Sequence, residues 1–97
     1  MKSYVDHTGI NDEAVIRKAL EDEGYFNIFR WCDAAGTRYG EHTHPHSEVR
    51  WVLSGTLQIT EEGHTLTLRP GDRLESPPET LHSAYIPEDC CYLCASR

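Results

Sequence analysis

The sequence of 97 residues lacks any apolar run long enough to cross a membrane, and its first stretch, MKSYVDHTGI, has no apolar core of the kind found in signal peptides. We therefore expect a cytoplasmic protein that has no membrane partner. Positive charge is also scarce, because nine Lys and Arg stand against 16 Asp and Glu and give a formal net charge of −7. Such a surface repels phosphate backbones, so nucleic acid is not an expected partner.

Cysteine is sparse as well. The four cysteines are unevenly spread, so a disulfide scaffold is not implied and reduced thiols are the simpler interpretation: Cys32, Cys90, Cys91 and Cys94. Cys91 and Cys94 have the C-x-x-C spacing of a redox pair or half a zinc site, but no second cysteine pair accompanies them. In a β-strand their side chains would point to opposite faces, which favours buried thiols.

The organised part of the chain begins with a helical pattern in NDEAVIRKALEDEG. Four apolar residues recur there at helical spacing: Val15, Ile16, Ala19 and Leu20. Asn11 or Asp12 can cap the start of this helix, and Gly24 suits its end. The acidic residues near its end oppose the helix dipole, so packing of the apolar stripe must hold it.

After the helix, the pattern changes to short runs rich in aromatic and β-branched residues: FNIFRWC, EVRWVLSG, TLQIT, HTLTLRPGD and CCYLC. Leucine and isoleucine alternate with polar residues on both sides of EEG, which predicts a hairpin, and RPGD predicts another tight turn. Because no second helical pattern is present, the expected fold is all-β, an antiparallel barrel or sandwich. We expect one domain, with an N-terminal helical segment over 1–25 and the barrel over 26–97.

The stretch HTHPHSE carries the candidate chemistry. In an extended strand His42 and His44 point to the same face, so both imidazoles can reach one ion. Glu48 has the same parity, and after a bend at Pro45 its carboxylate can meet that ion. Two nitrogens and one oxygen on adjacent corners suit iron(II), and equally manganese, nickel or zinc. His82, on a later β segment, offers a fourth ligand.

The other histidines carry less weight. His46 shares the parity of the cluster, but it follows Pro45 directly, so it can be either a ligand or a residue at the rim. His7 and His64 are expected to be exposed, in the N-terminal segment and in the EEGH turn.

The spacing of these residues resembles a known family. Five residues match the first cupin motif at every fixed position: Gly36, His42, His44, Glu48 and Gly55. In this motif five residues separate the first glycine from the first histidine, and one residue separates the two histidines. Three residues then precede the glutamate, and six precede the last glycine. The second motif is matched in part, by Gly71, Pro77 and His82. Glu79 stands where glycine is usual and Ile86 where asparagine is usual, so the turn before His82 is expected to differ.

The resemblance implies a small jelly-roll barrel with one divalent metal ion held by four residues: His42, His44, Glu48 and His82. EVRWVLSG also looks like the corresponding stretch of acireductone dioxygenases, although this chain is far shorter than those enzymes. A metal held in this way leaves two positions open. The leading interpretation is an enzyme that acts on a small oxygenated or carboxylate-bearing molecule. It would be either a metal-dependent dioxygenase, which is an oxidoreductase, or an isomerase. The alternative is a non-catalytic module that binds a small ligand or a metal.

Arg50 and Trp51 complete the candidate set. Arg50 shares the face of Glu48, so with Glu48 it is a candidate catalytic residue, as a clamp for a substrate carboxylate or enolate. The alternative is a structural ion pair, to Glu75 or Glu41. Trp51 would face outward and pack on the helix or on a second subunit. Exposed strand edges in so small a barrel add to the expectation of a homodimer.

Overall fold

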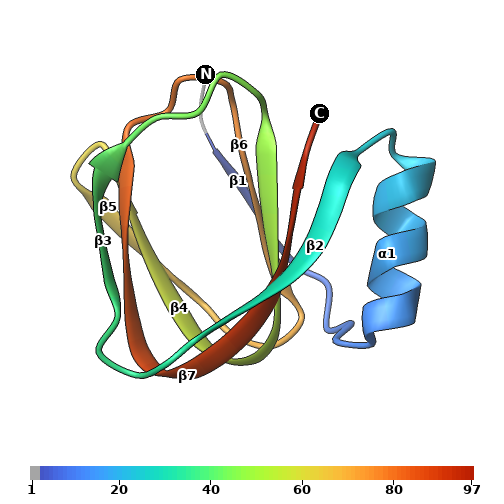
Figure 1. The fold of residues 1–97 in the computed structure, drawn as a ribbon, viewed down its shortest axis with the longest axis horizontal. Helices are drawn as coiled ribbons and strands as arrows, with labels where there is room; N and C mark the ends of the chain where they lie inside the picture. Colours follow the sequence, from blue (N-terminus) through green and yellow to red (C-terminus); the bar gives the residue numbers. More distant parts are fainter. Residues whose placement is uncertain (1–2) are drawn as a thin grey trace.

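The computed structural model describes residues 3–97, which form an antiparallel barrel with one short helix at its side (Figure 1). The elements are β1 Tyr4–His7, α1 Glu13–Asp22, β2 Phe26–Asp33, β3 Arg38–His42, β4 Glu48–Glu61, β5 His64–Leu68, β6 Asp72–Ser76 and β7 His82–Ser96. The strand order is β1-β6-β4-β7-β2, with β3 also paired to β7 and β5 to β4. The expected all-β antiparallel architecture is confirmed. No helix among the described residues is long and apolar enough to cross a membrane.

The N-terminal segment contributes to the sheet as well as carrying the helix. Strand β1 pairs antiparallel with β6, with Tyr4 opposite Glu75 and His7 opposite Asp72. No alternating apolar pattern marks these four residues, and three of the four are exposed. The strand forms because its backbone can pair with the free edge of β6. This is a tertiary effect that cannot be predicted from the local sequence.

Two long strands, β4 and β7, form the centre of the barrel. The runs EVRWVLSG and TLQIT are parts of the single strand β4, which pairs with β7 from Glu48 opposite Ser96 to Glu61 opposite His82. The strands approach closely at Gly55, where φ is +76° and a Cβ atom would lie 1.9 Å from the carbonyl oxygen of Asp89. Only glycine fits there, so the bend between the two runs depends on this residue.

The expected hairpin between β4 and β5 is confirmed. Leu57 lies opposite Leu68, and Ile59 opposite Leu66. Glu62 and Gly63 form the two-residue turn with φ values of +49° and +84°, which corresponds to a type I′ turn. These apolar pairs point into the barrel and form part of its core.

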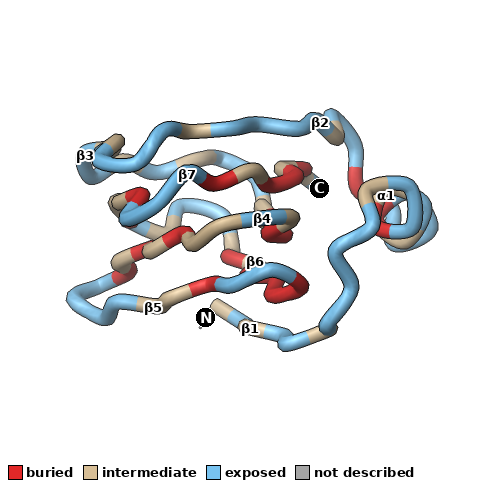
Figure 2. The backbone as a smooth tube through the Cα atoms, turned by 90° about the horizontal axis from the view of Figure 1, so that it is seen from below, coloured by how far each residue is buried: buried red, intermediate tan, exposed pale blue. Residues whose placement is uncertain are grey.

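The buried side chains divide into two clusters, one inside the barrel and one between the sheet and the helix (Figure 2). The inner cluster contains Val52, Leu57, Ile59, Leu68, Leu74, Ile86, Cys90 and Tyr92. The outer cluster contains Ile16, Leu20, Tyr25, Val49, Trp51, Leu93 and Ala95. Trp51 is 3% exposed and belongs to the same cluster as the helix residues, so the helix covers it within the chain itself.

The helix confirms most of the sequence-based expectation. Asp12 caps its start, accepting a hydrogen bond from the Val15 backbone N–H at 3.1 Å. Of the expected stripe, Ile16 and Leu20 are fully buried, whereas Val15 lies on the exposed side. Ala19 is half-buried and packs against the same cluster, so three of the four expected residues form the packed stripe.

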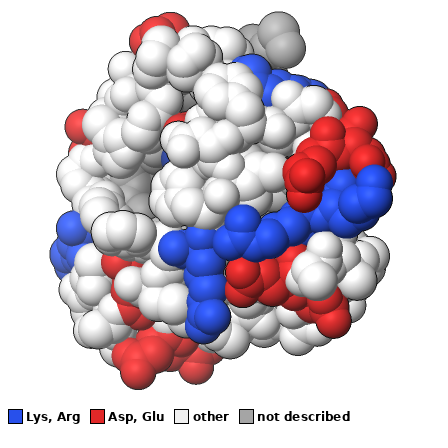
Figure 3. Space-filling model, turned by 45° about the vertical axis from the view of Figure 1, so that its right-hand side comes forward, with Lys and Arg blue, Asp and Glu red and all other residues white. Residues whose placement is uncertain are grey.

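An ion pair fixes the end of the helix to β6. Both nitrogens of the Arg73 fork donate to the Glu23 carboxylate, at 2.8 and 2.9 Å. The Arg73 guanidinium also lies 4.8 Å from the centre of the Trp51 ring. Charged side chains of both signs are interleaved across this side of the molecule (Figure 3). The acidic end of the helix is therefore held by pairing across to β6, which offsets its unfavourable position in the helix dipole.

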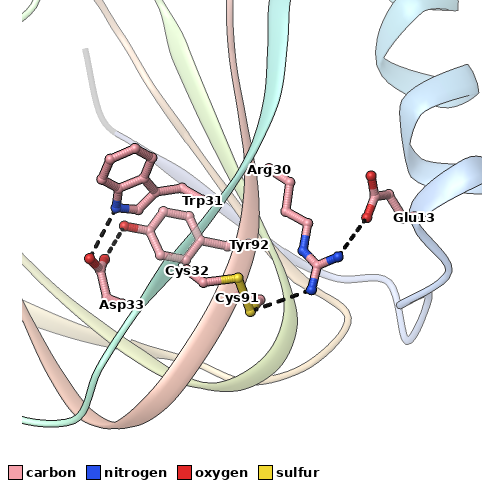
Figure 4. The surroundings of a disulfide bond; sticks show 7 residues. All are labelled: Glu13, Arg30, Trp31, Cys32, Asp33, Cys91 and Tyr92. Atoms are coloured by element: carbon pink, nitrogen blue, oxygen red, sulfur yellow. Dashed lines mark hydrogen bonds and ion pairs between the residues drawn. A yellow bond between two sulfur atoms is a disulfide. The ribbon is translucent and has the colours of Figure 1, made fainter.

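The expectation of reduced thiols is wrong for two of the four cysteines. Cys32 of β2 and Cys91 of β7 form a disulfide, and they lie directly opposite each other with their Cα atoms 4.1 Å apart (Figure 4). Facing positions on paired antiparallel strands bring Cβ atoms close enough for a disulfide, whereas the sequence separation of 59 between the two cysteines conceals the pairing. Cys90 and Cys94 are free.

Candidate metal centre

Three imidazoles gather at one end of the barrel. His42 ends β3, His44 lies in the loop that follows, and His82 begins β7. Each offers a nitrogen within 4.8 Å of those of the other two. The pairing of β3 with β7 places His42 directly opposite His82, and the loop then returns His44 to the same spot. The sequence spacing placed these three residues in one cluster, and the structure does bring them together.

Backbone carbonyls orient two of the three rings. The Nδ1 atom of His42 lies 2.7 Å from the Gly40 carbonyl oxygen, and Nδ1 of His82 lies 2.9 Å from that of Thr80. A carbonyl oxygen only accepts, so both Nδ1 atoms carry the hydrogen and both Nε2 atoms present a lone pair. This is the tautomer that a metal-ligating histidine requires, and at His82 a metal would take the place of the hydrogen bond that Nε2 receives from Arg50.

Burial favours the neutral form of two of the three rings, His82 and His44. It lowers the pKa of His82 to about 4, against an opposing hydrogen bond to Thr80, and the nearby Arg50 charge lowers it further. Burial also lowers the pKa of His44, although the Glu48 carboxylate opposes the shift. Both rings are therefore neutral at pH 7, which is the protonation state that binds metal. Three converging imidazoles fit a divalent transition metal.

Glu48 lies beside the three imidazoles but is not part of their close group. Its Oε1 atom is 3.3 Å from Nε2 of His44 and 3.1 Å from Nη2 of Arg50. Among the described residues, the group whose ligand atoms all lie within 4.8 Å of one another consists of the histidines alone. The structure therefore pairs this carboxylate with Arg50 and His44.

Arg50 reaches into the site, as its parity predicted, but neither Glu75 nor Glu41 is its partner. Its Nη2 atom donates to Glu48 at 3.1 Å and to Nε2 of His82 at 2.9 Å. Its Nη1 atom is buried and has no hydrogen-bond partner among residues 3–97. Glu75 instead accepts from Arg97 at 2.6 Å. The guanidinium therefore retains one unused donor group inside the barrel.

His42, His44, Glu48 and Arg50 border a cavity of about 280 Å³ that runs into the barrel. The rest of its wall is mostly apolar and includes four aromatic side chains: Phe29, Trp31, Tyr39 and Tyr92. Sequence reasoning missed these residues. The alternation of Phe29 and Trp31 in FNIFRWC was the available signal, since it places both on one face of β2.

The remaining histidines are not part of the close group, although His46 lines a small pocket beside it with His44 and His82. His46 is exposed, and its ring packs edge-on against Phe26 with the centroids 5.6 Å apart. His64 is exposed at the start of β5, as expected. His7 is also exposed, and its Nδ1 atom lies 2.7 Å from an Asp72 carboxylate oxygen.

The turn before His82 keeps the geometry that glycine would normally provide. Glu79 adopts a φ of +61°, so the expectation of a different turn is wrong. Its backbone N–H donates to the His44 carbonyl at 2.7 Å. This bond joins the two loops that carry the cluster, and it offsets the cost of a left-handed conformation in a residue with a side chain.

Residues 29–95 match the model of the cupin domain family, Cupin_2. Quercetin 2,3-dioxygenase from Bacillus subtilis (strain 168) is 29% identical over 77 residues, which are 78% of this chain and 23% of that protein. The chain therefore spans about a quarter of the length of this curated relative.

Solved structures show the same fold. DMSP lyase DddQ from Ruegeria pomeroyi DSS-3 superposes with a TM-score of 0.67 at 28% identity, covering 72% of this chain and 36% of that one. A DUF861 family protein from Thermotoga maritima superposes with a TM-score of 0.72, covering 99% of this chain and 100% of that one. Its identity is 13%, so this likeness concerns the fold alone.

Proposed function

We propose that this chain, which belongs to the cupin domain family, is a metal-dependent dioxygenase that acts on a small carboxylate-bearing or enolic molecule. The observation that carries the proposal is the group of three converging imidazoles, two of which line a cavity of about 280 Å³. The similarity to a quercetin dioxygenase supports the choice of reaction class.

The proposed metal ligands are His42, His44 and His82, with Glu48 as the fourth donor. This mixed nitrogen and oxygen set suits iron(II), manganese, nickel or zinc. When bound, such a metal supplies Lewis acidity and, if it is redox-active, a route for electrons from an enolate to dioxygen.

The chain's own side chains would bind and deprotonate the substrate. The unused Nη1 donor of Arg50 is available to a carboxylate or enolate oxygen. The Glu48 carboxylate, held by Arg50 and His44, is placed to accept a proton from a substrate hydroxyl or carbon. The apolar wall of the cavity limits the access of water to the enolate. The same groups would serve an isomerase that moves a proton between two carbons.

A non-catalytic binding module is the second candidate. The observation that favours it is that Glu48 is paired with Arg50 and His44 and stands outside the close group of the three histidines. In that case the cavity would hold a ligand without turnover. Oxygen uptake measured with candidate diols, enols and thiols separates the two functions, since ligand binding without product formation would support the module.

The metal assignment is tested by one pair of variants, purified without a histidine tag and analysed for metal by mass spectrometry. We expect His44→Ala to lose stoichiometric metal, because it removes one of the three converging nitrogens. His64→Ala is the matched control, since His64 is exposed on β5, and it should keep its metal. Equal metal content in the two variants would contradict the proposal.

A further inference from the structure

We infer that the cavity selects a molecule that combines one planar aromatic ring with one carboxylate. This inference rests on the proposed function, because it names the substrate class of the same site. The carboxylate would face Arg50, and the ring would lie against the aromatic side chains of β2, β3 and β7.

The case for an anion begins with Arg50. Its side chain is 12% exposed, and its Nη1 atom is fully buried without a hydrogen-bond partner among the described residues. A buried guanidinium donor without a partner is costly unless a bound group satisfies it. A carboxylate oxygen is the acceptor that matches both its charge and its planar geometry.

The case for a ring begins at the mouth of the cavity. Phe29 and Trp31 line the cavity, yet they remain 41% and 49% exposed. Large apolar side chains that border a cavity and stay in contact with water gain when an apolar ligand covers them. Leu57, Ile59 and Ala84 extend the same apolar surface deeper into the barrel.

The polar atoms of this aromatic wall are already paired with Asp33. Its carboxylate accepts from the indole N–H of Trp31 at 3.0 Å, from the Tyr39 hydroxyl at 2.6 Å and from the Tyr92 hydroxyl at 2.7 Å. Figure 4 shows the side chains of Trp31 and Tyr92 both turned toward this carboxylate. The wall therefore offers a ligand no free hydrogen-bond donor, which disfavours a sugar or a polyol and favours an apolar ring.

Volume limits the ligand further. Pockets for drug-sized molecules range from about 300 to 1,000 Å³. The cavity, at about 280 Å³, lies just below that range. It suits a molecule with a single ring rather than a multi-ring compound.

The selectivity is tested by titration calorimetry with four acids, both as purified and after treatment with a chelator. Benzoate is the probe. Cyclohexanecarboxylate removes planarity, gluconate replaces the ring with hydroxyls, and glycine betaine replaces it with a compact cation. We expect benzoate to bind at least tenfold more tightly than each of the others. Equal or tighter binding of any of the three, or no measurable binding of benzoate, would overturn the inference.

Two phenylalanines on β2 provide a matched pair of variants. Both are exposed, but only Phe29 lines the cavity, whereas Phe26 packs against His46. Phe29→Ala should weaken benzoate binding about tenfold, and Phe26→Ala should change it less than twofold. Phe29→Leu keeps apolar contact without a ring, so it should reduce the preference for benzoate over cyclohexanecarboxylate. Equal effects of the two alanine variants would also overturn the inference.

The outcomes for ring selection and for metal binding are separable. If benzoate is not selected while His44→Ala still loses metal, the inference fails and the proposed metal site stands. If benzoate is selected with the expected dependence on Phe29 but the purified protein carries no metal, the proposed function fails and the ring site remains.

Discussion

Arg50 shows how one residue serves two needs at the site. One nitrogen of its fork neutralises Glu48 and contacts His82, while the other stays unpaired. From the sequence alone, a substrate clamp and a structural ion pair were alternatives. In the structure the two roles are compatible, because a guanidinium has several donors that point in different directions.

Two substitutions of Arg50 separate these roles. Arg50→Lys keeps the charge but loses the planar fork, so we expect benzoate binding to weaken by roughly 1 to 3 kcal/mol while the fold is retained. Arg50→Met removes the charge beside Glu48, whose side chain is 23% exposed, and should lower the free energy of unfolding by about 1 to 3 kcal/mol. Calorimetry and urea denaturation measure the two effects. Benzoate affinity that is unchanged in Arg50→Lys would reject the anion-binding role.

Residue spacing predicted part of the site and could not predict the rest. The same-face rule along a strand identified His42 and His44, and motif spacing added His82. Asp33 escaped notice because its three hydrogen-bond partners come from three different strands. No local pattern records which strands will become neighbours.

At the scale of elements, the attachment of α1 to the barrel combines apolar packing with one ion pair. Ile16 and Leu20 bury the helix against the sheet, and Glu23 binds Arg73 at the point where the helix ends. The hydrogen bonds from Arg73 hold the pKa of the Glu23 carboxyl below its usual value of about 4.3. Its contribution to stability is therefore present above that value and is lost as the pH falls through the lowered pKa.

We expect Glu23→Gln to lower the free energy of unfolding by about 1 kcal/mol at pH 7, a modest value because the Glu23 side chain is partly exposed. At pH 3 the difference from the unmodified protein should shrink, since this pH lies below the usual pKa of the carboxyl, where the stabilising contribution is being lost. Urea denaturation at both pH values measures this. Glu21→Gln, on the exposed side of the same helix, is the control and should have little effect. A loss that is as large at pH 3 as at pH 7 would contradict the ion-pair account.

Element boundaries were predicted where local chemistry decides them. Asp12 and Gly24 bracket the helix, and the EEG turn defines the β4–β5 hairpin. The single long strand β4 was not foreseen, because its bend at Gly55 requires the close approach of a distant residue, Asp89. The turn at Glu79 was misjudged for a similar reason, since its bond to His44 comes from another loop.

At the scale of the whole molecule, two strands end the sheet order, β1 and β2. The sequence-based argument for a homodimer relied partly on Trp51, but α1 covers that residue. These two edges remain, beside the singly paired strands β3 and β5, and each of the two carries an exposed aromatic residue, Tyr4 on β1 and Phe26 on β2. A second copy that paired with one of these edges would satisfy its free backbone groups and cover its apolar surface.

We therefore propose a homodimer, and we expect light scattering at micromolar concentration to give twice the chain mass of 11.1 kDa. Tyr4→Lys and Phe26→Lys place a charge on one edge each, so the variant that dissociates identifies the edge that pairs. A monomeric mass for the unmodified protein would contradict the proposal.

The disulfide between Cys32 and Cys91 closes most of the barrel into a covalent loop. The candidate ligands all lie inside it: His42, His44, Glu48 and His82. A protease that cut the chain once within this loop, for example in the turn around Glu79, would therefore leave two fragments joined by the sulfur bridge. Such a nicked protein would keep both halves of its candidate metal centre tethered, and it would separate into fragments only under reducing conditions.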